Sequence, residues 1–542
     1  MKKYLIIIIA IMLPLFGCED DNKDRKFMAF DELVVLDYLA ETPQYTAWNK
    51  LILQAGMGET FRLSTTPMTC FIVNNETLLS YLKEKYNIDR VEDLDEETAK
   101  TLVKYHTLPN TTMYLSSFRN GKLADTTASG DYLACLFTSG DDGAVYLNQK
   151  SKIINYDKVM VNGIIHELDH VIDPVVNTFM DYLQAHSERY SIMNEMINAC
   201  PDSTKALFSQ LQDNSVKNMK SRRTLFVVPD EIYHAKGYAD FAELKAKLPL
   251  SDEEVEQYVR YHLLNREMYG KDIIQRLEYG SVTKAGDGSS STTHQLVDNK
   301  GVALETMAAN KLILAKDDGI IDILFNEDAT DGGVKFLNET SYNIPLKNGV
   351  LHELDGVLKM AEPSSMITLV ELTDYVNFEK ISTYRQEGLG KTQTLMAADD
   401  YAPYLKWEST PVTKGDAVAY IVFTEGSYNF KGNGFLNGDC LYISPGPVGF
   451  VEFITPPIPK GTYSVWPFYK TTKNTGGKYR VSIDGNTIGG EFTAYTPGYD
   501  NFWITKLGMV TFTETKSHTI RVSVGSRQGE MLLDMFILEP II

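Results

Sequence analysis

Apolar residues recur along this chain in two different patterns. In the first part, we expect helices over Leu33–Leu53 and Phe179–Ala199, each followed by a short apolar run, from Thr69 or Thr224, that is typical of a buried strand. After Pro363 helical periodicity is almost absent, and alternating runs are separated by Gly-rich turns. These alternating runs are AVAYIVF from Ala417, TYSVWPFY from Thr462, KYRVSIDG from Lys478, HTIRVSV from His518 and MLLDMFIL from Met531. The pattern therefore predicts mixed helices and strands followed by an all-β sandwich.

The mixed part is duplicated. NGIIHELDHVI, Asn162–Ile172, returns 186 residues later as NGVLHELDGVL, Asn348–Leu358, and the leading helix, the short strand and a Tyr-His pair recur in the same order. The offset is only 156 residues at the pairs that end in His106 and His262, so the second copy has about thirty extra residues between them. The predicted insertions are the Gly/Ser stretch from Ala285 and the acidic stretch from Asn326.

These recurring blocks resemble the fasciclin family. The first box resembles TCFIVNNETL and TLFVVPDEI, the middle segment resembles YHTLPN and YHLLNR, and the last box resembles NGIIHELDHVIDP and NGVLHELDGVL. The resemblance assigns residues 30–174 and 175–363 to two fasciclin-like domains, called repeat 1 and repeat 2 below. It implies an α+β wedge of short strands flanked by helices, as in extracellular adhesion proteins, with neither catalysis nor a cofactor.

The last part, residues 364–542, resembles a second family. IPKGTYSVWPFY, GKYRVSIDGNTIGGEF and SHTIRVSVGSRQGEMLLDMFILEP are similar to the closing strands of galactose-binding-like jelly rolls, which include carbohydrate-binding modules. Asp484-Gly485 and Leu533-Asp534 are the best points of this match, which covers about Asp416 to Pro540. The resemblance implies a β-sandwich and leaves its ligand open, because one fold hosts many functions.

The N-terminus reads as an export signal. Lys2 and Lys3 precede the apolar run Leu5–Phe16, which is too short to span a bilayer and is typical of a signal peptide over residues 1–17. Cys18 follows in a sequence that resembles a lipobox, so we expect it to carry a lipid. Residues 18–29 then form an acidic tether that resembles those of surface-facing Bacteroidota-type outer-membrane lipoproteins. The alternative is a flexible linker with a chance cysteine.

Charge, hydropathy and cysteine spacing argue against nucleic-acid binding, a transmembrane helix and a cysteine metal site. The net charge of −20 argues against nucleic-acid binding, which depends on Lys and Arg contacts to phosphate. No later apolar run reaches transmembrane length, so a lipid on Cys18 is the only membrane attachment that we expect. The other four cysteines lack metal-ligand spacing and read as buried thiols, although Cys70 and Cys135 could pair in an oxidising compartment.

His166 to His170 form a literal H-E-x-x-H, the zinc motif of metalloproteases when it lies on a helix. Here an Asn-Gly turn precedes it and Asp173-Pro174 ends the segment, so we expect a strand, in which the two histidines lie roughly 13 Å apart. A structural histidine is therefore favoured over zinc chemistry. His106 and His166 have two possible roles. They could form a metal-binding pair, or they could be core histidines that are hydrogen-bonded to the backbone, which is the simpler hypothesis.

The aromatic residues of the sandwich also have two explanations. Trp503, Tyr499, Tyr495 and Asn501 lie in a turn-rich segment and are candidates for a sugar-stacking platform on a loop. Burial between the sheets explains such residues equally well, and Trp466, in an alternating strand, is expected in the core. Both interpretations stay open for Trp503.

Together these features predict a cell-surface lipoprotein that binds glycan or extracellular matrix without catalysis. Proteins of this layout resemble accessory lipoproteins of outer-membrane nutrient-uptake complexes, so a porin-like transporter and its lid lipoprotein are expected partners. The alternative is a structural adhesin or scaffold that acts through protein contacts and has no sugar site. A third possibility, hydrolysis of a bound polymer, lacks a visible acid-base pair in the sequence.

Overall fold

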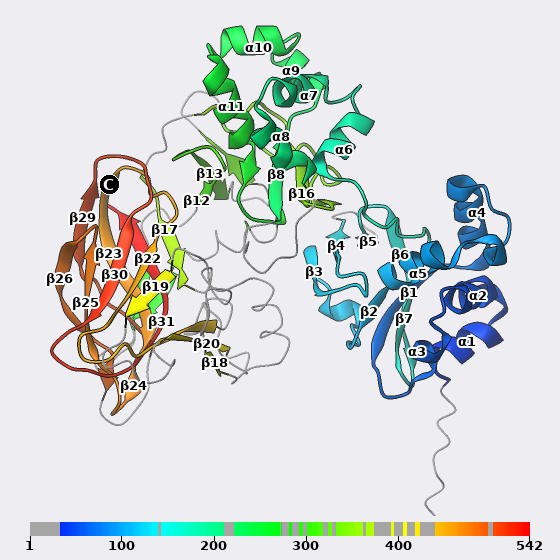
Figure 1. Ribbon diagram of the computed structural model, residues 1–542, viewed down its shortest axis with the longest axis horizontal. Helices are drawn as coiled ribbons and strands as arrows, with labels where there is room; N and C mark the ends of the chain where they lie inside the picture. Colours follow the sequence, from blue (N-terminus) through cyan, green and yellow to red (C-terminus); the bar gives the residue numbers. More distant parts are fainter. Residues whose placement is uncertain are drawn as a thin grey trace, which may run out of the picture. The chain divides into compact units, whose positions relative to one another are not determined.

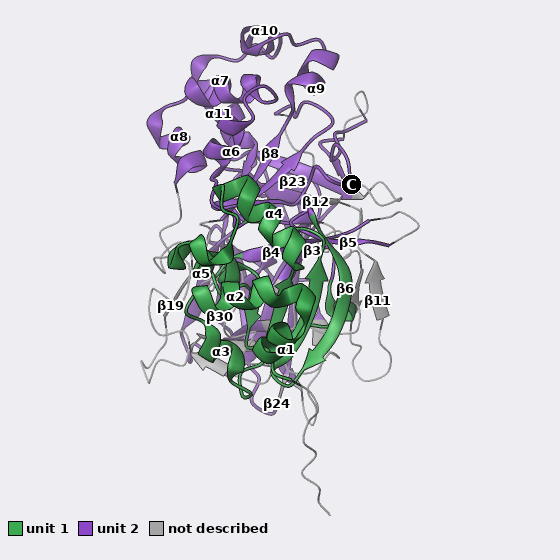
Figure 2. Ribbon diagram, turned by 90° about the vertical axis from the view of Figure 1, so that its right-hand side faces the viewer, with its two compact units in different colours: residues 1–118, 125–131, 151–173 green, residues 119–124, 132–150, 174–542 purple. Residues whose placement is uncertain are grey.

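The computed structural model forms two compact units (Figure 2), and each is described by itself. The first unit contains residues 1–118, 125–131 and 151–173, and the second contains residues 119–124, 132–150 and 174–542. The structure describes residues 33–138, 143–210, 222–270, 273, 281–284, 292–295, 301–317, 323–327, 332–360, 365–372, 392–394, 405–408, 418–422, 439–496 and 502–541. The predicted signal peptide, Cys18 and the tether lie outside these residues, and the division into three domains stays a prediction.

In the first unit, short helices accompany a sheet ordered β2-β1-β7-β6 (Figure 1). The central strands β1 and β7 are parallel, whereas β2 and β6 run antiparallel to them. Repeat 1 consists of α1 (Val35–Glu41), η2 (Pro43–Tyr45), α2 (Thr46–Gln54), α3 (Gly58–Arg62), β1 (Met68–Ile72), α4 (Asn75–Tyr86), η3 (Val91–Asp93), α5 (Glu96–Tyr105), β2 (Thr107–Pro109), η4 (Leu115–Ser117), β3 (Gly121–Thr126), β4 (Tyr132–Phe137), β5 (Val145–Leu147), β6 (Ser151–Met160) and β7 (Gly163–Leu168).

The second unit repeats this plan. Its four-stranded sheet has the order β15-β16-β8-β9, in which β16 and β8 are parallel and both outer pairs are antiparallel. A separate sheet has the order β12-β13-β14. Repeat 2 consists of α6 (Phe179–Ala185), α7 (Ser191–Asn198), α8 (Asp202–Ser209), β8 (Arg223–Val227), α9 (Asp230–Ala235), α10 (Phe241–Lys247), α11 (Asp252–Tyr261), β9 (Leu263–Leu264), β10 (Ser281–Lys284), β11 (Thr292–Gln295), β12 (Gly301–Glu305), β13 (Leu312–Asp317), β14 (Ile323–Phe325), β15 (Ile344–Leu346) and β16 (Gly349–Glu353).

Each predicted leading helix is wrong in one respect, because the structure divides it in two. In repeat 1, α1 ends before Pro43, whose ring cannot continue an α-helix, and α2 follows. In repeat 2, α6 ends at Ala185, and the backbone N–H groups of Ser191 and Ile192 at the start of α7 donate to the carboxylate of Asp230 at 2.7 and 3.1 Å. A carboxylate at this position satisfies donors that a helix leaves unpaired. The breaks therefore have different local causes in the two repeats.

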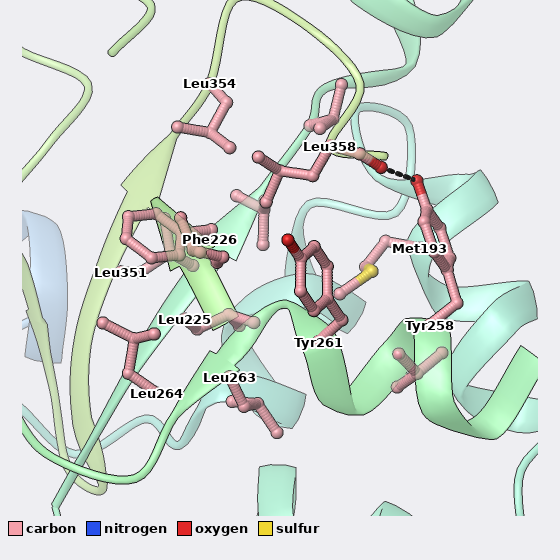
Figure 3. Close-up of a cluster of buried hydrophobic side chains, with 14 of the residues drawn as sticks. Met193, Leu225, Phe226, Tyr258, Tyr261, Leu263, Leu264, Leu351, Leu354 and Leu358 are labelled. Atoms are coloured by element: carbon pink, nitrogen blue, oxygen red, sulfur yellow. Dashed lines mark hydrogen bonds between the residues drawn. The ribbon is translucent and has the colours of Figure 1, made fainter. Parts of the chain in front are cut away.

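The core of repeat 2 lies between its helices and its sheet (Figure 3). Leu225 and Phe226 of β8 and Tyr258 and Tyr261 of α11 all belong to this buried cluster, in which the Phe226 ring lies 5.1 Å from that of Phe325 of β14. The hydroxyl of Tyr258 donates to the carbonyl oxygen of Leu358 at 2.9 Å, so this large aromatic residue is buried without an unsatisfied polar group. The three- and four-residue spacing of the buried residues of α11 places them on one face of the helix.

The predicted insertion after Tyr261-His262 contains an additional hairpin. Strands β10 and β11 pair antiparallel from Ser281↔Gln295 to Lys284↔Thr292. The Gly/Ser residues that join these strands lie outside the described residues. The acidic stretch from Asn326 begins directly after β14. The extra length of repeat 2 therefore includes a hairpin between β9 and β12, where repeat 1 passes from β2 to β3.

The predicted β-sandwich is confirmed. One sheet has the order β18-β20-β21-β31-β23-β28, with β17 also paired to β31 and β29 to β23, and the other has the order β19-β22-β30-β25-β26. The strands are β17 (Thr368–Glu371), β18 (Thr392–Thr394), β19 (Leu405–Glu408), β20 (Val418–Val422), β21 (Asp439–Ile443), β22 (Phe450–Ile454), β23 (Gly461–Lys470), β24 (Thr472–Lys473), β25 (Lys478–Ile483), β26 (Asn486–Thr493), β27 (Tyr495–Thr496), β28 (Phe502–Ile504), β29 (Gly508–Phe512), β30 (Thr519–Val524) and β31 (Met531–Pro540). The chain thus combines two α+β repeats with an all-β sandwich, as its hydrophobic pattern predicts.

The core of the sandwich follows the alternation of its strands. Leu533, Phe536 and Leu538 of β31 pack between the sheets, whereas Met535 and Ile537 belong to a second buried cluster. The register between β23 and β31 shifts after Phe468, which changes the alternation at that point of the strand. Across the described part of the chain, the helices are all too short or too polar to cross a membrane.

Candidate functional site

The two N-G-x-x-H-E-L-D segments form strands β7 and β16, as predicted. A two-residue hairpin turn precedes each strand. The second residue of this turn is Asn162 in repeat 1 and Asn348 in repeat 2. The glycine that follows is needed for a close approach of parallel strands, since a Cβ on Gly163 would lie 2.2 Å from the carbonyl oxygen of Met68. The asparagine side chain also ties this turn to the first helix, because Asn162 Oδ1 accepts the backbone N–H of Val35 at 2.8 Å.

In repeat 1, the strand histidine connects two neighbouring segments. His166 Nε2 lies 2.9 Å from the carbonyl oxygen of Met113, and Nδ1 accepts the backbone N–H of Asp157 at 3.4 Å. Asp157 has a left-handed backbone with φ 58°, and its carboxylate accepts the backbone N–H of Leu115 at 2.8 Å. Since one nitrogen meets an acceptor and the other a donor, the ring is held in one neutral tautomer.

Repeat 2 has the same arrangement with different side chains. His352 Nε2 lies 2.9 Å from the carbonyl oxygen of Met268, and Nδ1 accepts the backbone N–H of Asn343 at 3.0 Å. Asn343 is also left-handed, with φ 62°, and its side-chain oxygen accepts the N–H of Gly270 at 2.8 Å. Asp157 and Asn343 both belong to residue types that tolerate this conformation. The strand histidines therefore connect the same two neighbouring segments in both repeats.

The histidines of the two Tyr-His pairs end helices α5 and α11. His106 Nδ1 lies 2.8 Å from the carbonyl oxygen of Leu102, and Nε2 accepts the backbone N–H of Ile172 at 2.9 Å. His262 Nδ1 lies 2.8 Å from the carbonyl oxygen of Tyr258. Burial lowers the pKa of both imidazoles to about 4. Because the ring of His106 uses both nitrogens for backbone contacts, the interpretation as a core histidine is supported over a metal pair with His166.

The glutamates of these segments, Glu167 and Glu353, form hydrogen bonds with nearby side chains. Glu353 is buried and receives two hydrogen bonds from Arg189, at 2.9 and 3.0 Å, and a third from the hydroxyl of Tyr190. Burial disfavours the ionised form of Glu353, but the bonds from Arg189 and Tyr190 outweigh it and lower the pKa of the carboxyl. Glu167 of repeat 1 accepts a bond from the amide of Asn155 at 2.5 Å. Both glutamates therefore serve structural contacts.

The H-E-x-x-H geometry of a zinc protease is not formed. His166 lies on β7 and is fully buried, whereas His170 lies past the end of the strand and is half-exposed, with its Nδ1 2.9 Å from Asp169. Within the described residues, no group of three or more His, Cys, Asp and Glu side chains is arranged to hold a metal ion. Cys70, Cys135, Cys200 and Cys440 are buried, and no disulfide joins these described cysteines.

In the sandwich, the interpretation of Trp466 as a core residue is confirmed. Its side chain is 9% exposed and packs in a cluster with Cys440, Phe468 and Ile537. The indole N–H donates to the carboxylate of Glu539 at 2.9 Å, so the one polar atom of the ring is satisfied. Trp466 is therefore not a surface platform.

Of the four predicted platform residues, Tyr495 is the one whose side chain the structure describes. Trp503 lies in β28, where its backbone pairs with Tyr469 of β23, so its expected position on a loop is wrong. Short pairing at the edge of a sheet can form from a turn-rich sequence, because it needs only a neighbouring strand with free backbone groups. Tyr499 and Asn501 lie outside the described residues.

An arginine that the sequence analysis did not identify stacks on the ring of Tyr495. The guanidinium of Arg527 lies 3.9 Å from the centroid of the half-buried Tyr495 ring. Its Nε donates to the carbonyl oxygen of Gly476 at 3.0 Å and its Nη2 to that of Asn474 at 3.1 Å. Arg527 is exposed, and it makes no ion pair with a carboxylate of the described residues. In contrast, Arg480 and Arg521 of the sandwich pair with glutamates at 2.5 and 2.6 Å.

Close backbone contacts hold the loops around this arginine. We call residues 474–477, 494–496 and 525–530 the loop cluster. A Cβ on Gly476 would lie 1.9 Å from the carbonyl oxygen of Ala494, and one on Gly529 would lie 2.3 Å from that of Thr475. The carboxylate of Glu530 accepts bonds from the hydroxyls of Thr475 and, at 2.7 Å, Tyr442. A cation stacked on an aromatic ring within such fixed loops can donate hydrogen bonds to a polar ligand. The sequence signal was an arginine in the turn VGSRQG, which its Gly and Ser neighbours mark as a loop.

Comparison with known proteins identifies the first repeat. Residues 43–174 match the family model of the Fasciclin domain. A segment of 140 residues is 26% identical to Stabilin-2 of Rattus norvegicus and covers 26% of this chain and 9% of that protein. The same values of 140 residues and 26% hold for Stabilin-2 of Mus musculus, of which 5% is covered. This chain therefore shares one segment with much longer relatives.

Three solved structures are similar to portions of this chain. A FAS1 domain pair from the insect cell adhesion molecule fasciclin I covers 59% of this chain and 98% of its own, with 14% identity and a TM-score of 0.25. A family 35 carbohydrate-binding module from Clostridium thermocellum covers 28% of this chain and 100% of its own, with 12% identity and a TM-score of 0.17. A structure of TmCBM61 in complex with β-1,4-galactotriose covers 25% of this chain and 88% of its own, with 19% identity and a TM-score of 0.18.

Proposed function

We propose that this chain, in which residues 43–174 form a fasciclin domain and the C-terminal part forms a β-sandwich, binds a glycan at the loop cluster of the sandwich. The stack of Arg527 on Tyr495 carries this proposal. An exposed guanidinium that pairs with no carboxylate of the described residues is notable in a chain with a net charge of −20, where acidic side chains outnumber basic ones. Its donors are available to the hydroxyl or carboxylate oxygens of a sugar.

The surroundings of Arg527 favour binding over a merely structural role. Two of its N–H groups are used by the carbonyls of Asn474 and Gly476, which fix the plane of the guanidinium over Tyr495. The remaining donors are presented by a side chain that has already lost much of its rotational freedom. Such preorganisation reduces the entropy cost of binding a polar ligand. Trp503 of β28 is proposed to add a stacking surface for the sugar ring.

The proposed cellular setting follows from the N-terminal sequence. Cys18 is proposed to carry a lipid that anchors the chain to the outer membrane, with the folded part facing the exterior. The partners proposed for this setting are a glycan or matrix polymer, together with an outer-membrane transporter and its lid lipoprotein. In this role the chain acts by binding, without catalysis and without a cofactor.

A structural adhesin without a sugar site is the second candidate function. The observation that favours it is the exposure of two aromatic residues of repeat 1, Tyr114 at 45% and Tyr156 at 59%. Large exposed aromatic side chains are enriched in protein interfaces. The two functions make different demands, because an adhesin needs the surface of repeat 1 and a glycan receptor needs the loop cluster.

A glycan array probed with the purified chain and with two variants tests the proposal. Arg527→Gln is expected to weaken glycan binding by about tenfold or more, as for the loss of a charge-assisted hydrogen bond. Arg480→Gln, which removes an arginine of the same sandwich that is paired to Glu491, serves as the matched control and should bind as the parent does. Neutral and uronic-acid glycans on the same array separate hydroxyl from carboxylate recognition. Equal binding by both variants, or binding to no glycan, would contradict the proposal.

A further inference from the structure

The two repeats differ in the exposure of one pair of tyrosines. In repeat 1, Tyr114 follows Met113, whose carbonyl contacts the strand histidine, and Tyr156 precedes the left-handed residue Asp157. A hydrogen bond from the N–H of Leu115 to the carboxylate of Asp157 connects the two segments directly beside these tyrosines. We call Tyr114 and Tyr156 the tyrosine pair of repeat 1.

Repeat 2 places tyrosines at the same two positions. Tyr269 follows Met268, and Tyr342 precedes the left-handed Asn343. The bond from the N–H of Gly270 to the side chain of Asn343 again connects the two segments. The tyrosine positions of the two repeats are therefore equivalent on two grounds. The strand histidines make the same backbone contacts, and the Met-Tyr sequence recurs.

Another part of the second unit covers Tyr269 of this pair, whereas Tyr342 is half-buried and its ring stacks on Phe336 at 4.7 Å. Tyr269 is 0% exposed and forms a buried cluster with Val350 of β16 and Ala134 of β4. The side-chain amide of Gln149 donates to the backbone carbonyl of Tyr342. Ala134 and Gln149 belong to residues 132–150, the hairpin of β4 and β5 that the second unit includes. In repeat 2, the β4–β5 hairpin therefore covers the position of Tyr269.

The pair of repeat 1 has no such cover from the residues that the structure describes. Tyr114 is 45% exposed and Tyr156 is 59% exposed, and Ile154 on the same strand is 43% exposed. These exposed side chains lie on β6 and on the segment before η4, which the hydrogen bond between Leu115 and Asp157 joins. Repeat 2 buries Tyr269 fully and Tyr342 partly, whereas both tyrosines of repeat 1 are exposed, and exposed aromatic side chains of this kind are typical of an interaction surface.

The chain contains a second hairpin of the covering type. In the β4–β5 hairpin, Asn148 accepts the N–H of Ala134 through Oδ1 at 2.9 Å and donates its own N–H to the carbonyl of Ala134 at 2.7 Å. In the β13–β14 hairpin, Asn326 makes the same two contacts with Leu314, at 2.9 and 2.7 Å. Leu314 is therefore at the position of Ala134, and it is only half-buried.

We propose that the tyrosine pair of repeat 1 binds the β13–β14 hairpin of a second copy of this chain. The hairpin of β4 and β5 is already used within the second unit, whereas β13–β14 presents Leu314 at the equivalent position. The contact joins different surfaces of the two copies, so each copy keeps one open surface and further copies add in a row. This association does not depend on glycan binding.

Charge gives the association a characteristic salt dependence. Two copies with a net charge of −20 each repel one another at long range, and the exposed surface of the tyrosine pair is mainly apolar. Salt screens the repulsion over a Debye length of about 10 Å at 0.1 M, so the association strengthens as salt increases. An interface held by surface ion pairs weakens under the same change.

Sedimentation velocity of the purified chain over a range of concentrations measures the association. The Tyr114→Ser, Tyr156→Ser double variant is expected to raise the dissociation constant by about tenfold or more, because aromatic residues dominate such interfaces. Leu53→Gln removes an exposed apolar side chain of the same unit, on α2, and is expected to leave the constant within about twofold. An unchanged constant in the double variant overturns the proposal, as does a chain that stays monomeric at the highest concentration in high salt.

Cross-linking identifies the occupant separately. Glu327 follows Asn326 as Gln149 follows Asn148, so it is expected to lie near Tyr156 of the other copy. Mixing a Tyr156→Cys chain with a Glu327→Cys chain should give a disulfide-linked heterodimer under mild oxidation, since the native thiols at 70, 135, 200 and 440 are buried. Linking of Tyr156→Cys chains only to one another shows a symmetric contact and overturns the assigned occupant. Absence of any linked product at concentrations where the parent associates has the same consequence.

Discussion

The imidazole of His352 lies with its Nε2 2.9 Å from the carbonyl oxygen of Met268, and repeat 1 reproduces this distance between His166 and Met113. In both repeats the other ring nitrogen accepts a backbone N–H from a left-handed residue. A protonated ring cannot accept that bond, so each strand histidine is required in its neutral form. Burial lowers the pKa of His352 to about 4 and also lowers that of His166.

The free energy of unfolding should therefore fall in mild acid. The folded pKa of about 4 for His106, His262 and His352 lies below the unfolded value of about 6.5, so the unfolded chain binds more protons between these values. Stability is full above about pH 6.5 and is lost as the pH drops toward 4, by up to about 3 kcal/mol per histidine. Urea unfolding between pH 7.5 and 4.5, followed separately in each repeat, measures this loss.

Variants assign the acid sensitivity to particular rings. His352→Gln keeps a polar side chain but cannot titrate, so it should reduce the slope of stability against pH while lowering stability at pH 7.5. His170→Gln makes the same substitution at a half-exposed histidine past the end of β7 and is the control for the substitution itself. A slope that is the same in parent and His352→Gln would show that other groups cause the acid sensitivity.

The hydrophobic pattern predicts the strands and turns of this fold better than its irregular positions. The Asn-Gly dipeptide before His166 and His352 indicates a tight turn and a strand, and both are present. The left-handed backbone at Asp157 and Asn343 has no signal of its own in the sequence, because it depends on a histidine nine residues later. Such positions depend on tertiary contacts, which a local pattern does not contain.

The glycine after each of these turns should be irreplaceable. In Gly163→Ala the new Cβ meets the carbonyl oxygen of Met68, a backbone atom that cannot move away without disturbing β1. We expect a loss of about 3 kcal/mol in the free energy of unfolding, at the upper end for overpacking. Gly490→Ala is the control, since no heavy atom lies within 4 Å of its Cβ position. Chemical denaturation compares the two, and equal stabilities would contradict the close-approach argument.

Metal content tests the interpretation of His166 and His170 directly. One histidine is buried in a strand with both nitrogens near backbone groups, and the other is half-exposed beside Asp169. We therefore expect no stoichiometric zinc in the purified chain and no change in metal content in His170→Ala. Elemental analysis provides the measurement. Zinc at one equivalent per chain that disappears in His166→Ala or His170→Ala would restore the metalloprotease hypothesis.

The candidate glycan site was harder to predict than the fold. Aromatic residues of the sandwich were visible in the sequence, but Trp466 is buried with a partner in Glu539, and Tyr495 is stacked with Arg527. Composition alone cannot distinguish these environments, because an aromatic ring fits a core and a binding surface equally well. The pairing of Tyr495 with Arg527 joins residues far apart in the sequence, and only the folded loops bring them together.

The membrane anchor rests on Cys18, which lies outside the described residues. Cys18→Ala removes the thiol that a lipid would modify, so the variant should lose membrane association while keeping its fold. Membrane fractionation and labelling with a fatty-acid analogue measure this, with Cys70→Ala as a control that removes a buried thiol. Continued labelling of Cys18→Ala would refute lipidation at this residue.

Two tryptophans of the sandwich should respond differently to the same change. Trp466→Ala removes a buried side chain and leaves the carboxylate of Glu539 without the indole donor, so we expect a loss of about 3 to 5 kcal/mol in the free energy of unfolding. Trp503→Ala is expected to lose about 1 kcal/mol or less and to bind glycan at least about tenfold more weakly, as for a residue of a binding surface. Stability and affinity must be measured on the same preparations, because a destabilised sandwich also loses its ligand. If Trp503→Ala is as destabilised as Trp466→Ala, or binds glycan as well as the parent does, the sugar platform does not include Trp503.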